Sequence, residues 1–132
     1  MSQENVEIVR RIFKEWALGN FETGDYLDPD VAFTWVNPIL TPGGETRGIA
    51  ELAERVKEFL SAWDGLTATA EEIIDAGETV VAMEEWRGRG KASGAPVHVR
   101  QASVWTISNG KVIHVVVYAD RAEALEAAGL SK

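Results

Sequence analysis

Glu84 is the side chain in this sequence best suited to acid–base chemistry. Residues 79–89 are predicted to form a strand, so Glu84 and Trp86 share one face because strand side chains alternate. We expect this face to be interior, since the opposite face carries Arg87, whose burial is costly without a partner. A carboxyl group among apolar side chains has a raised pKa, which suits a general acid or base.

Arg100 and Asn37 are the polar candidates that would assist Glu84. Arg100, on the next strand, is expected to face Glu84 at the mouth of a pocket. Such a pair would bind a polar substrate group or serve the structure alone, and the charge of Arg100 would oppose the rise in the carboxyl pKa. Asn37 precedes Pro38, which predicts the end of a strand at this position.

Large aromatic side chains are the expected apolar wall of a binding site, and they are Trp16, Tyr26, Trp35, Trp63 and Trp86. Core packing accounts for most such residues, because each aromatic ring buries a large area. A pocket lined by indole rings would instead suit a flat or cyclic apolar ligand. The two interpretations differ in whether the rings contact a ligand or only one another.

The elements that must position these side chains follow a simple order. Apolar residues at helical spacing predict long helices at 3–18 and 49–63, a short helix at 21–27 and a closing helix at 121–128. Alternating or β-branched runs predict strands at 31–36, 66–74, 79–89, 97–108 and 111–119. Residues 39–48 are rich in glycine and proline and predict a loop bordering the pocket. Helices gathered on one side of a mostly antiparallel sheet make a single α+β domain, residues 1–132.

The hairpin around Asn109-Gly110 decides which side chains of its two strands face inward. A two-residue turn at this pair places Thr106 opposite Ile113. The smaller, more apolar face, which also carries Arg100, is assigned to the pocket through Ala102, Val104, Val115 and Val117. The other face mixes aromatic and polar groups and is expected to contact a partner through Trp105, His114, Val116 and Tyr118. A register shift of one residue would exchange the two faces.

Composition excludes several classes of function. The 132 residues include 13 basic and 21 acidic side chains, and the net charge of −8 argues against nucleic acids and anionic membranes as partners. The lack of cysteine excludes thiolate sites, and two histidines exclude a three-histidine zinc site, so we expect neither a metal nor a cofactor. The sequence indicates no signal peptide and no membrane span, which makes the cytoplasm the expected location.

Short motifs spread over nearly the whole chain point to a family. They lie at residues 5–11, 27–31, 47–48 and 74–77, and most clearly at 104–106, 109–112 and 118–125. Together they resemble the SnoaL-like branch of the nuclear-transport-factor-two-like superfamily, which has the ketosteroid isomerase-like fold. The resemblance implies a curved sheet wrapped as a cone around two long helices, with a short C-terminal helix and an apolar pocket. It also implies a homodimer formed through the outer face of the sheet.

The resemblance allows single positions to be compared with known enzymes. Ketosteroid isomerases carry their proton-shuttling carboxylate before a proline, where this chain has Asn37, and an amide is no general base at neutral pH. Limonene epoxide hydrolase holds its nucleophilic water with an aromatic residue and an asparagine two residues apart, which Trp35 and Asn37 match. The acid–arginine–acid relay of that hydrolase falls on Glu84, Trp86 and Val117 here, and none of the three is retained.

Three functions remain open at this point. The first is a cofactor-independent isomerase, cyclase or hydrolase acting on a small cyclic apolar molecule, with Glu84 as acid or base and Asn37 and Arg100 as positioning groups. The second is a non-catalytic domain that binds a small hydrophobic molecule. The third is a dimerisation module. The variant Glu84→Gln separates the first two, because only catalysis requires the carboxyl group.

Overall fold

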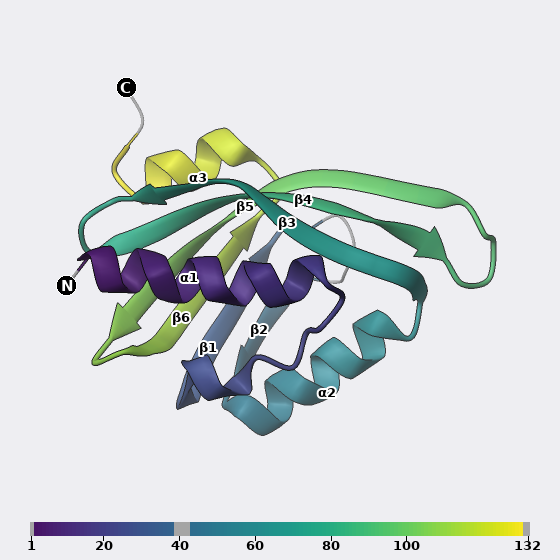
Figure 1. Ribbon diagram of the computed structural model, residues 1–132, viewed down its shortest axis with the longest axis horizontal. Helices are drawn as coiled ribbons and strands as arrows, with labels where there is room; N and C mark the ends of the chain where they lie inside the picture. Colours follow the sequence, from purple (N-terminus) through teal and green to yellow (C-terminus); the bar gives the residue numbers. More distant parts are fainter. Residues whose placement is uncertain (1, 39–42, 131–132) are drawn as a thin grey trace.

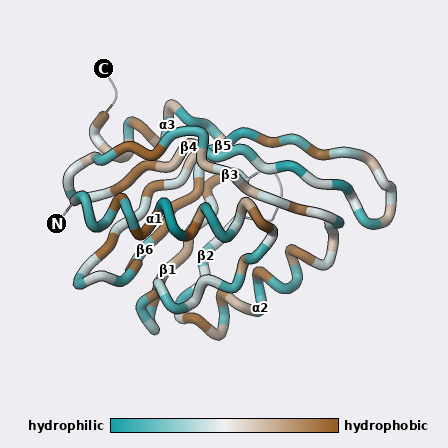
Figure 2. The backbone as a smooth tube through the Cα atoms, in the orientation of Figure 1, coloured by the Kyte–Doolittle hydropathy of each residue, from teal (hydrophilic) through white to brown (hydrophobic). Residues whose placement is uncertain are grey.

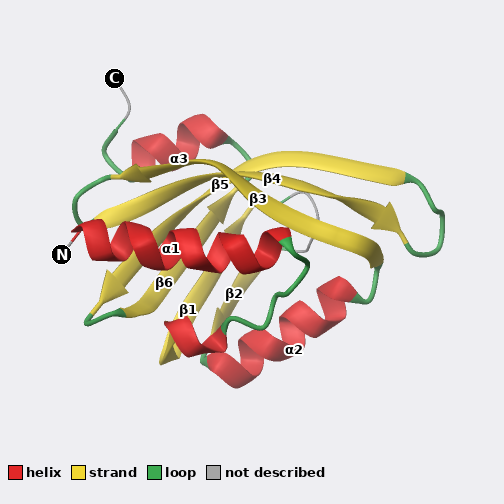
Figure 3. Cartoon of the chain, in the orientation of Figure 1, coloured by secondary structure: helices red, strands yellow, loops and turns green. Residues whose placement is uncertain are grey.

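Six strands form one curved, mixed sheet that wraps around two long helices (Figures 1 and 3). The computed structural model describes residues 2–38 and 43–130. All neighbouring strands are antiparallel except β1 and β6, which are parallel. This arrangement confirms the predicted α+β class. The strands lie in the order β2 (Gly44–Arg47), β1 (Leu27–Val36), β6 (Lys111–Tyr118), β5 (Pro96–Ser108), β4 (Thr79–Gly90) and β3 (Trp63–Asp75).

Two helices, α1 (Ser2–Ala17) and α2 (Ile49–Leu60), cover the inner face of the sheet. Apolar residues at helical spacing place Val9, Ile12 and Phe13 of α1 on one side, where all three are buried. Figure 2 shows the same amphipathic pattern as hydrophilic and hydrophobic segments that alternate along α1. The main hydrophobic core therefore lies between the helices and the inner face.

The short helix α3 (Arg121–Ala127) lies on the outer face of the sheet. The Asp120 side chain caps its first turn by accepting a hydrogen bond from the backbone N–H of Ala122 at 2.8 Å. Ala124 is buried, and it packs in a second cluster with Val81, Met83, Ala102 and Val104. The expectation that all helices gather on one side was therefore wrong for α3.

The Asn109-Gly110 turn joins β5 and β6 as predicted. Asn109 has φ 51° and Gly110 has φ 78°, the positive values that a tight hairpin turn of this kind needs. Ser108 pairs with Lys111 across this two-residue turn.

A register shift beyond the turn changes the predicted faces. It lies between Ile107 and Thr106, so that Thr106 pairs with His114 rather than with the expected Ile113. Val115 and Val117 of β6 face inward, as expected, and Val112 is also buried in the main core. On β5 the inward-facing side chains are those expected on the outer face, and they include Gln101, Ser103 and Trp105.

Element boundaries differ from the prediction in three further places. The predicted loop at 39–48 contains β2, and its residues 39–42 lie outside the described residues. The second helix ends at Leu60, and β3 begins at Trp63. The short helix expected at 21–27 is one 3₁₀ turn, Gly24–Tyr26. None of the described helices is long and apolar enough to span a bilayer.

Candidate functional site

A pocket lies between the inner face of the sheet and the helices α1 and α2. Its cavity of about 110 Å³ is comparable to apolar protein cavities of about 150 Å³ that bind benzene. Most of its wall is aromatic or aliphatic, and among the described residues only Glu84 and Arg55 contribute an ionisable side chain. Such a pocket fits a ring-bearing apolar molecule that carries few polar groups. Its apolar wall includes Trp16, Phe33, Trp35, Leu52, Trp86 and Val115.

Glu84 is the buried polar centre of this pocket. It extends from the inner face of β4 and is only 2% exposed. The indole N–H of Trp86 donates to Oε1 at 2.7 Å, and Nε2 of Gln101 donates to the same oxygen at 3.1 Å. The hydroxyl of Ser103 donates a hydrogen bond to Oε2. Three neutral donors therefore fix the orientation of the carboxyl group.

The direction of the Ser103 hydrogen bond follows from its second partner, Trp105. The indole N–H of Trp105 approaches Ser103 Oγ at 2.7 Å. An indole nitrogen only donates, so Ser103 Oγ is the acceptor of this bond. The single hydroxyl hydrogen of Ser103 is then directed to Glu84. Trp105 is 1% exposed, so this chain of donors is anchored in the hydrophobic core.

Burial raises the pKa of Glu84, because the charged carboxylate loses its hydration. The hydrogen bonds from Ser103, Trp86 and Gln101 act in the opposite direction, as does the charge of Arg121. The net direction is upward. A buried carboxyl group with a raised pKa beside an apolar pocket is suited to act as a general acid or base.

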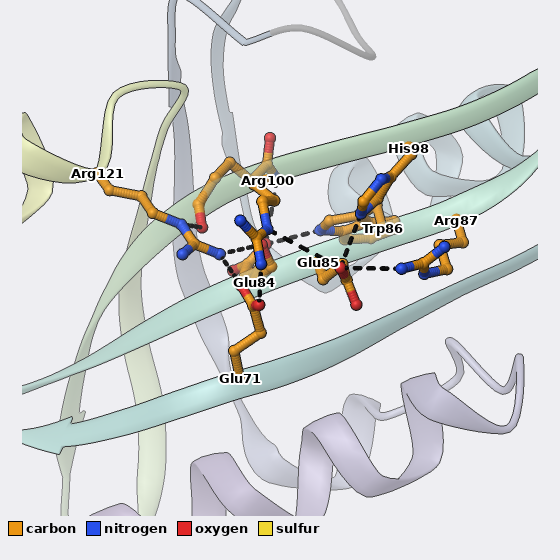
Figure 4. A network of polar contacts seen from close by, with 9 residues as sticks. Glu71, Glu84, Glu85, Trp86, Arg87, His98, Arg100 and Arg121 are labelled. Carbon is orange, nitrogen blue, oxygen red and sulfur yellow. Dashed lines mark hydrogen bonds and ion pairs between the residues drawn. The ribbon is translucent and has the colours of Figure 1, made fainter.

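A network of ion pairs lies on the outer face of the sheet, directly behind Glu84 (Figure 4). Arg121 at the start of α3 donates to the backbone carbonyls of Glu84 at 2.8 Å and Gln101 at 3.3 Å, and it also pairs with Glu71. The Arg121 hydrogen bond is the main cause that lowers the pKa of Glu71, and Arg100 adds to it. Arg121 thereby ties α3 to the two strands that carry the site.

Arg100 belongs to this outer network and does not face the Glu84 carboxyl group. It pairs with Glu71 at 2.7 Å and lies 3.9 Å from Glu85, with its side chain 59% exposed. His98 also contacts Glu85, at 2.7 Å, and this hydrogen bond is the main cause that lowers the pKa of Glu85. The expected Glu84–Arg100 pair was therefore wrong. The register shift between β5 and β6 explains the error, because it reverses the face on which Arg100 lies.

The expected aromatic wall is present in part. Trp16, Trp35 and Trp86 line the pocket, and the ring of Trp86 stacks on Phe21 with centroids 5.6 Å apart. Trp63 packs beside Phe59, with ring centroids 6.3 Å apart. Tyr26 packs against the main core, and neither Tyr26 nor Trp63 is among the described residues of the pocket wall.

Ala102 and Val104 lie on the opposite face of the sheet from the pocket, where they pack under α3. Conversely, Trp105 was expected on the outer face but is buried on the inner face, in the pocket wall. The expectation that Ala102 and Val104 face the pocket was wrong, as was the expectation that Trp105 faces outward. The cause is the same for both, because the register shift moves alternate side chains of β5 to the other face.

Asn37 is exposed and lies outside the pocket wall described here. Its φ of 47° is in the left-handed region, which asparagine tolerates better than most residues, and it directly follows β1. This position agrees with the interpretation that Asn37 ends the strand. Its neighbours Trp35 and Pro38 both reach the wall.

Four polar residues of the site were missed by sequence reasoning: Thr23, Arg55, Gln101 and Ser103. Gln101 and Ser103 lie on the same face of β5 as Trp105, and burial of that tryptophan was the available signal for them. Thr23 accepts a hydrogen bond from the Trp16 indole at 3.4 Å and thereby connects α1 to the segment before the 3₁₀ turn. No group of three or more acidic or histidine side chains that could hold a metal occurs in the part of the chain that the structure describes.

The comparison with protein families identifies the chain. Residues 9–115 match the family described as the SnoaL-like domain. The chain belongs to the SnoaL-like domain family. This match covers most of the sequence, including the strands that carry Glu84 and Ser103. No curated protein sequence matches the chain.

Solved structures share the architecture of this SnoaL-like domain. An NTF2-like protein from Burkholderia thailandensis has a TM-score of 0.76 at 23% identity, covering 95% of this chain and 96% of its own. An NTF2-like protein of unknown function from Burkholderia pseudomallei has a TM-score of 0.76 at 21% identity, covering 93% and 95%. TerC, co-crystallised with polyporic acid, has a TM-score of 0.76 at 19% identity, covering 96% and 98%. These likenesses establish the NTF2-like fold.

Proposed function

We propose that this SnoaL-like domain is a cofactor-independent enzyme that moves a proton on a small, ring-bearing apolar molecule. Glu84 is the acid or base of the reaction. The observation that supports this proposal most strongly is a single buried carboxyl group, with a raised pKa, in the wall of an otherwise apolar and aromatic pocket.

The chemistry begins with the Glu84 carboxylate removing a proton from a carbon next to a carbonyl group of the bound molecule. The C–H electron pair becomes the enolate, and Glu84 becomes a carboxylic acid. The acid then returns the proton to the same or another carbon, which restores the carboxylate. Isomerases and cyclases share this enolate step, so the proposal covers both. Trp86, Gln101 and Ser103 hold the carboxyl group in one orientation during the transfer.

The apolar wall supports a cyclic substrate. The indole rings of Trp16, Trp35, Trp86 and Trp105 all contribute to it, and each presents a large flat surface. Water is displaced when such a molecule binds, which strengthens electrostatic interactions at the carboxyl group. The neighbour TerC was crystallised with polyporic acid, which supports a role for this fold in holding a small organic molecule.

Hydrogen–deuterium exchange into a model substrate tests the proposal. We would use 2-tetralone, a bicyclic ketone with exchangeable C–H groups beside its carbonyl, in D₂O, and follow the loss of C–H signal by proton NMR. The variants are Glu84→Gln and the control Glu85→Gln, whose residue lies next along β4 and contacts the outer network. We expect wild type and Glu85→Gln to accelerate exchange above buffer, and Glu84→Gln to lose at least about 100-fold of that acceleration.

An exchange rate in Glu84→Gln equal to that of wild type would contradict the proposal. So would wild-type exchange no faster than that in buffer across a panel of cyclic ketones. Circular dichroism of each variant shows whether a lost rate reflects a lost carboxyl group or a lost fold.

A binding domain is the second candidate, and one observation favours it. Both carboxyl oxygens of Glu84 already accept hydrogen bonds from the protein, as expected of an anchored structural group. This candidate predicts ligand binding without turnover. Binding would then be insensitive to Glu84→Gln but sensitive to Trp86→Ala, because Trp86 supplies part of the apolar wall.

We also propose that two copies of this domain form a homodimer through the outer face of the sheet. His114, Val116 and Tyr118 are half-buried on this face in the single chain. His114 contacts Thr34 of β1 at 3.3 Å, which extends the same face toward the sheet edge away from α3.

A further inference from the structure

Arg55 is the second ionisable side chain of the pocket wall, and the proposed proton transfer does not use it. It lies on α2, half-buried, with its guanidinium carbon 4.2 Å from the centre of the Trp35 ring. One of its nitrogens donates to the carbonyl of Gly43 at 3.4 Å. The stacking on Trp35 uses the flat face of the guanidinium, whereas its N–H donors all lie in the plane of the group. Trp35 therefore holds the guanidinium in a defined orientation at the wall.

The sheet register separates this arginine from Glu84. Trp35 on β1 pairs with Val117 on β6, which pairs with Ser103 on β5, and Ser103 donates its hydroxyl hydrogen to Glu84 on β4. Trp35 and Glu84 are therefore three strands apart, which corresponds to about 14 Å measured along the curved sheet. The intervening wall includes Val117, Trp105 and Gln101, and its described residues carry no charge. The pocket thus has a positive group at the β1 side and a carboxyl group at the β4 side.

We propose that this pocket takes a ring-bearing carboxylate, whose carboxylate group binds to Arg55 and whose rings extend along the apolar wall toward Glu84. The inference rests on the proposed function in that it assigns the substrate class for the same site. Arg55 is a specificity-determining residue in this arrangement, and Glu84 acts at the other end of the bound molecule.

The chemistry of the two ends determines the orientation. A guanidinium presents parallel N–H donors that match the two oxygens of a carboxylate, and its positive charge strengthens these bonds in an apolar surrounding. A carboxylate placed beside Glu84 would instead meet another acidic group, and like charges at short distance repel. The apolar rings of the ligand then lie against the apolar wall between Arg55 and Glu84. A cationic ligand group would be repelled by Arg55. A ligand that places a positive charge at the β1 side of the pocket is therefore excluded.

A matched pair of probes tests this inference by binding alone. We would measure by titration calorimetry the affinities of naphthalene-2-carboxylate and its neutral amide, naphthalene-2-carboxamide, which have the same rings and nearly the same shape. We expect wild type to bind the carboxylate at least about tenfold more tightly, since hydrogen bonds to charged groups contribute that much or more. Arg55→Met keeps an unbranched apolar stem and removes the guanidinium with its charge, so it should abolish the preference.

Two further variants make the result specific. Lys57→Met removes an exposed cation two residues further along α2 and should leave the preference unchanged. Arg55→Lys keeps the charge but not the planar fork, so it should retain only part of the preference, and it serves if Arg55→Met fails to fold. Undetectable binding of the carboxylate, equal binding of both probes to wild type, or an unchanged preference in Arg55→Met would overturn the inference.

The result is independent of catalysis by Glu84. If Glu84→Gln retains the carboxylate preference while wild type shows no exchange of C–H groups, the substrate class stands and the proposed reaction fails. If Glu84→Gln abolishes exchange while both probes bind wild type equally, the reaction stands and the assignment of Arg55 fails.

Discussion

Trp105 and Ser103 lie two residues apart on the inner face of β5, and the Trp105 indole N–H donates to Ser103 Oγ at 2.7 Å. This bond leaves the hydroxyl hydrogen of Ser103 for the carboxyl group of Glu84. A tryptophan of the hydrophobic core thereby sets the direction of a hydrogen bond in the pocket wall. Glu84 receives donors from Trp86 on its own strand and from Gln101 and Ser103 on β5.

Ser103→Ala should raise the pKa of Glu84 further, because it removes a hydrogen bond that stabilises the carboxylate. Ser103→Thr keeps the hydroxyl group and should leave the pKa near that of wild type. Carbon-13 NMR of the glutamate side chains across pH measures both variants. If Ser103→Ala left the midpoint of Glu84 unchanged, the hydroxyl would not be a donor to the carboxylate.

Glu84 should make the stability of the protein depend on pH above 4.5, the usual pKa of a glutamate. Its folded-state pKa is raised, so between 4.5 and that raised value the folded chain binds more protons than the unfolded chain. The free energy of unfolding therefore falls as pH rises through this window. In Glu84→Gln this part of the fall should disappear, and urea denaturation of both proteins at closely spaced pH values measures it.

Glu71 and Glu85 should change the free energy of unfolding with pH in the opposite direction to Glu84. Their pKa values are lowered by hydrogen bonds from Arg121 and from His98 respectively. The stability that they contribute is present above 4.5 and is lost as pH falls through their lowered values. If the difference in free energy of unfolding between wild type and Glu84→Gln did not change with pH above 4.5, the raised pKa of Glu84 would be contradicted.

The pattern of single elements was predictable from the sequence, because it depends on local periodicity. The spacing of Val9, Ile12 and Phe13 indicated the buried face of α1, and all three are buried. Alternation along β4 placed Glu84 and Trp86 on the inner face, where both are found. The faces of these residues could be predicted without knowing how the strands pair.

The relation between β5 and β6 was not predictable in the same way. A two-residue turn at Asn109-Gly110 implies a regular ladder, but the pairing shifts by one residue beyond Ile107. One shift moved Ser103 into the site and Arg100 out of it. The contact of Arg55 with Trp35 was equally hidden, because it joins α2 to β1 through tertiary packing rather than through any spacing in the sequence.

Arg121 and Arg100 should differ in their effects on stability although both pair with Glu71. Arg121 is 30% exposed and also donates to two backbone carbonyls, so Arg121→Met should cost about 1–3 kcal/mol by thermal or urea denaturation. Arg100 is 59% exposed, and Arg100→Met should cost less than about 1 kcal/mol. Equal losses in the two variants would show that Arg121 does not hold α3 to the sheet.

The proposed homodimer can be tested with one charge on the outer face of the sheet. Val116→Glu places a carboxylate where two copies would meet, and burial of an unpaired charge is costly. Light scattering after size-exclusion chromatography should give a dimer for wild type and a monomer for Val116→Glu. Asn109→Asp adds a similar charge at the exposed hairpin turn, away from this face, and should remain dimeric. A monomeric wild type at micromolar concentration would contradict the proposal.

The titration of Glu84 itself is the sharpest test of its role as the acid or base of the pocket. Carbon-13 NMR of the side-chain carboxyl groups, with the Glu84 signal assigned by its absence in Glu84→Gln, follows each acid from low to neutral pH. We expect Glu84 to titrate above the usual range of a glutamate, and Glu71 and Glu85 to titrate below it. A Glu84 signal that titrates at or below the usual range would contradict the role of this residue as the acid or base of the pocket.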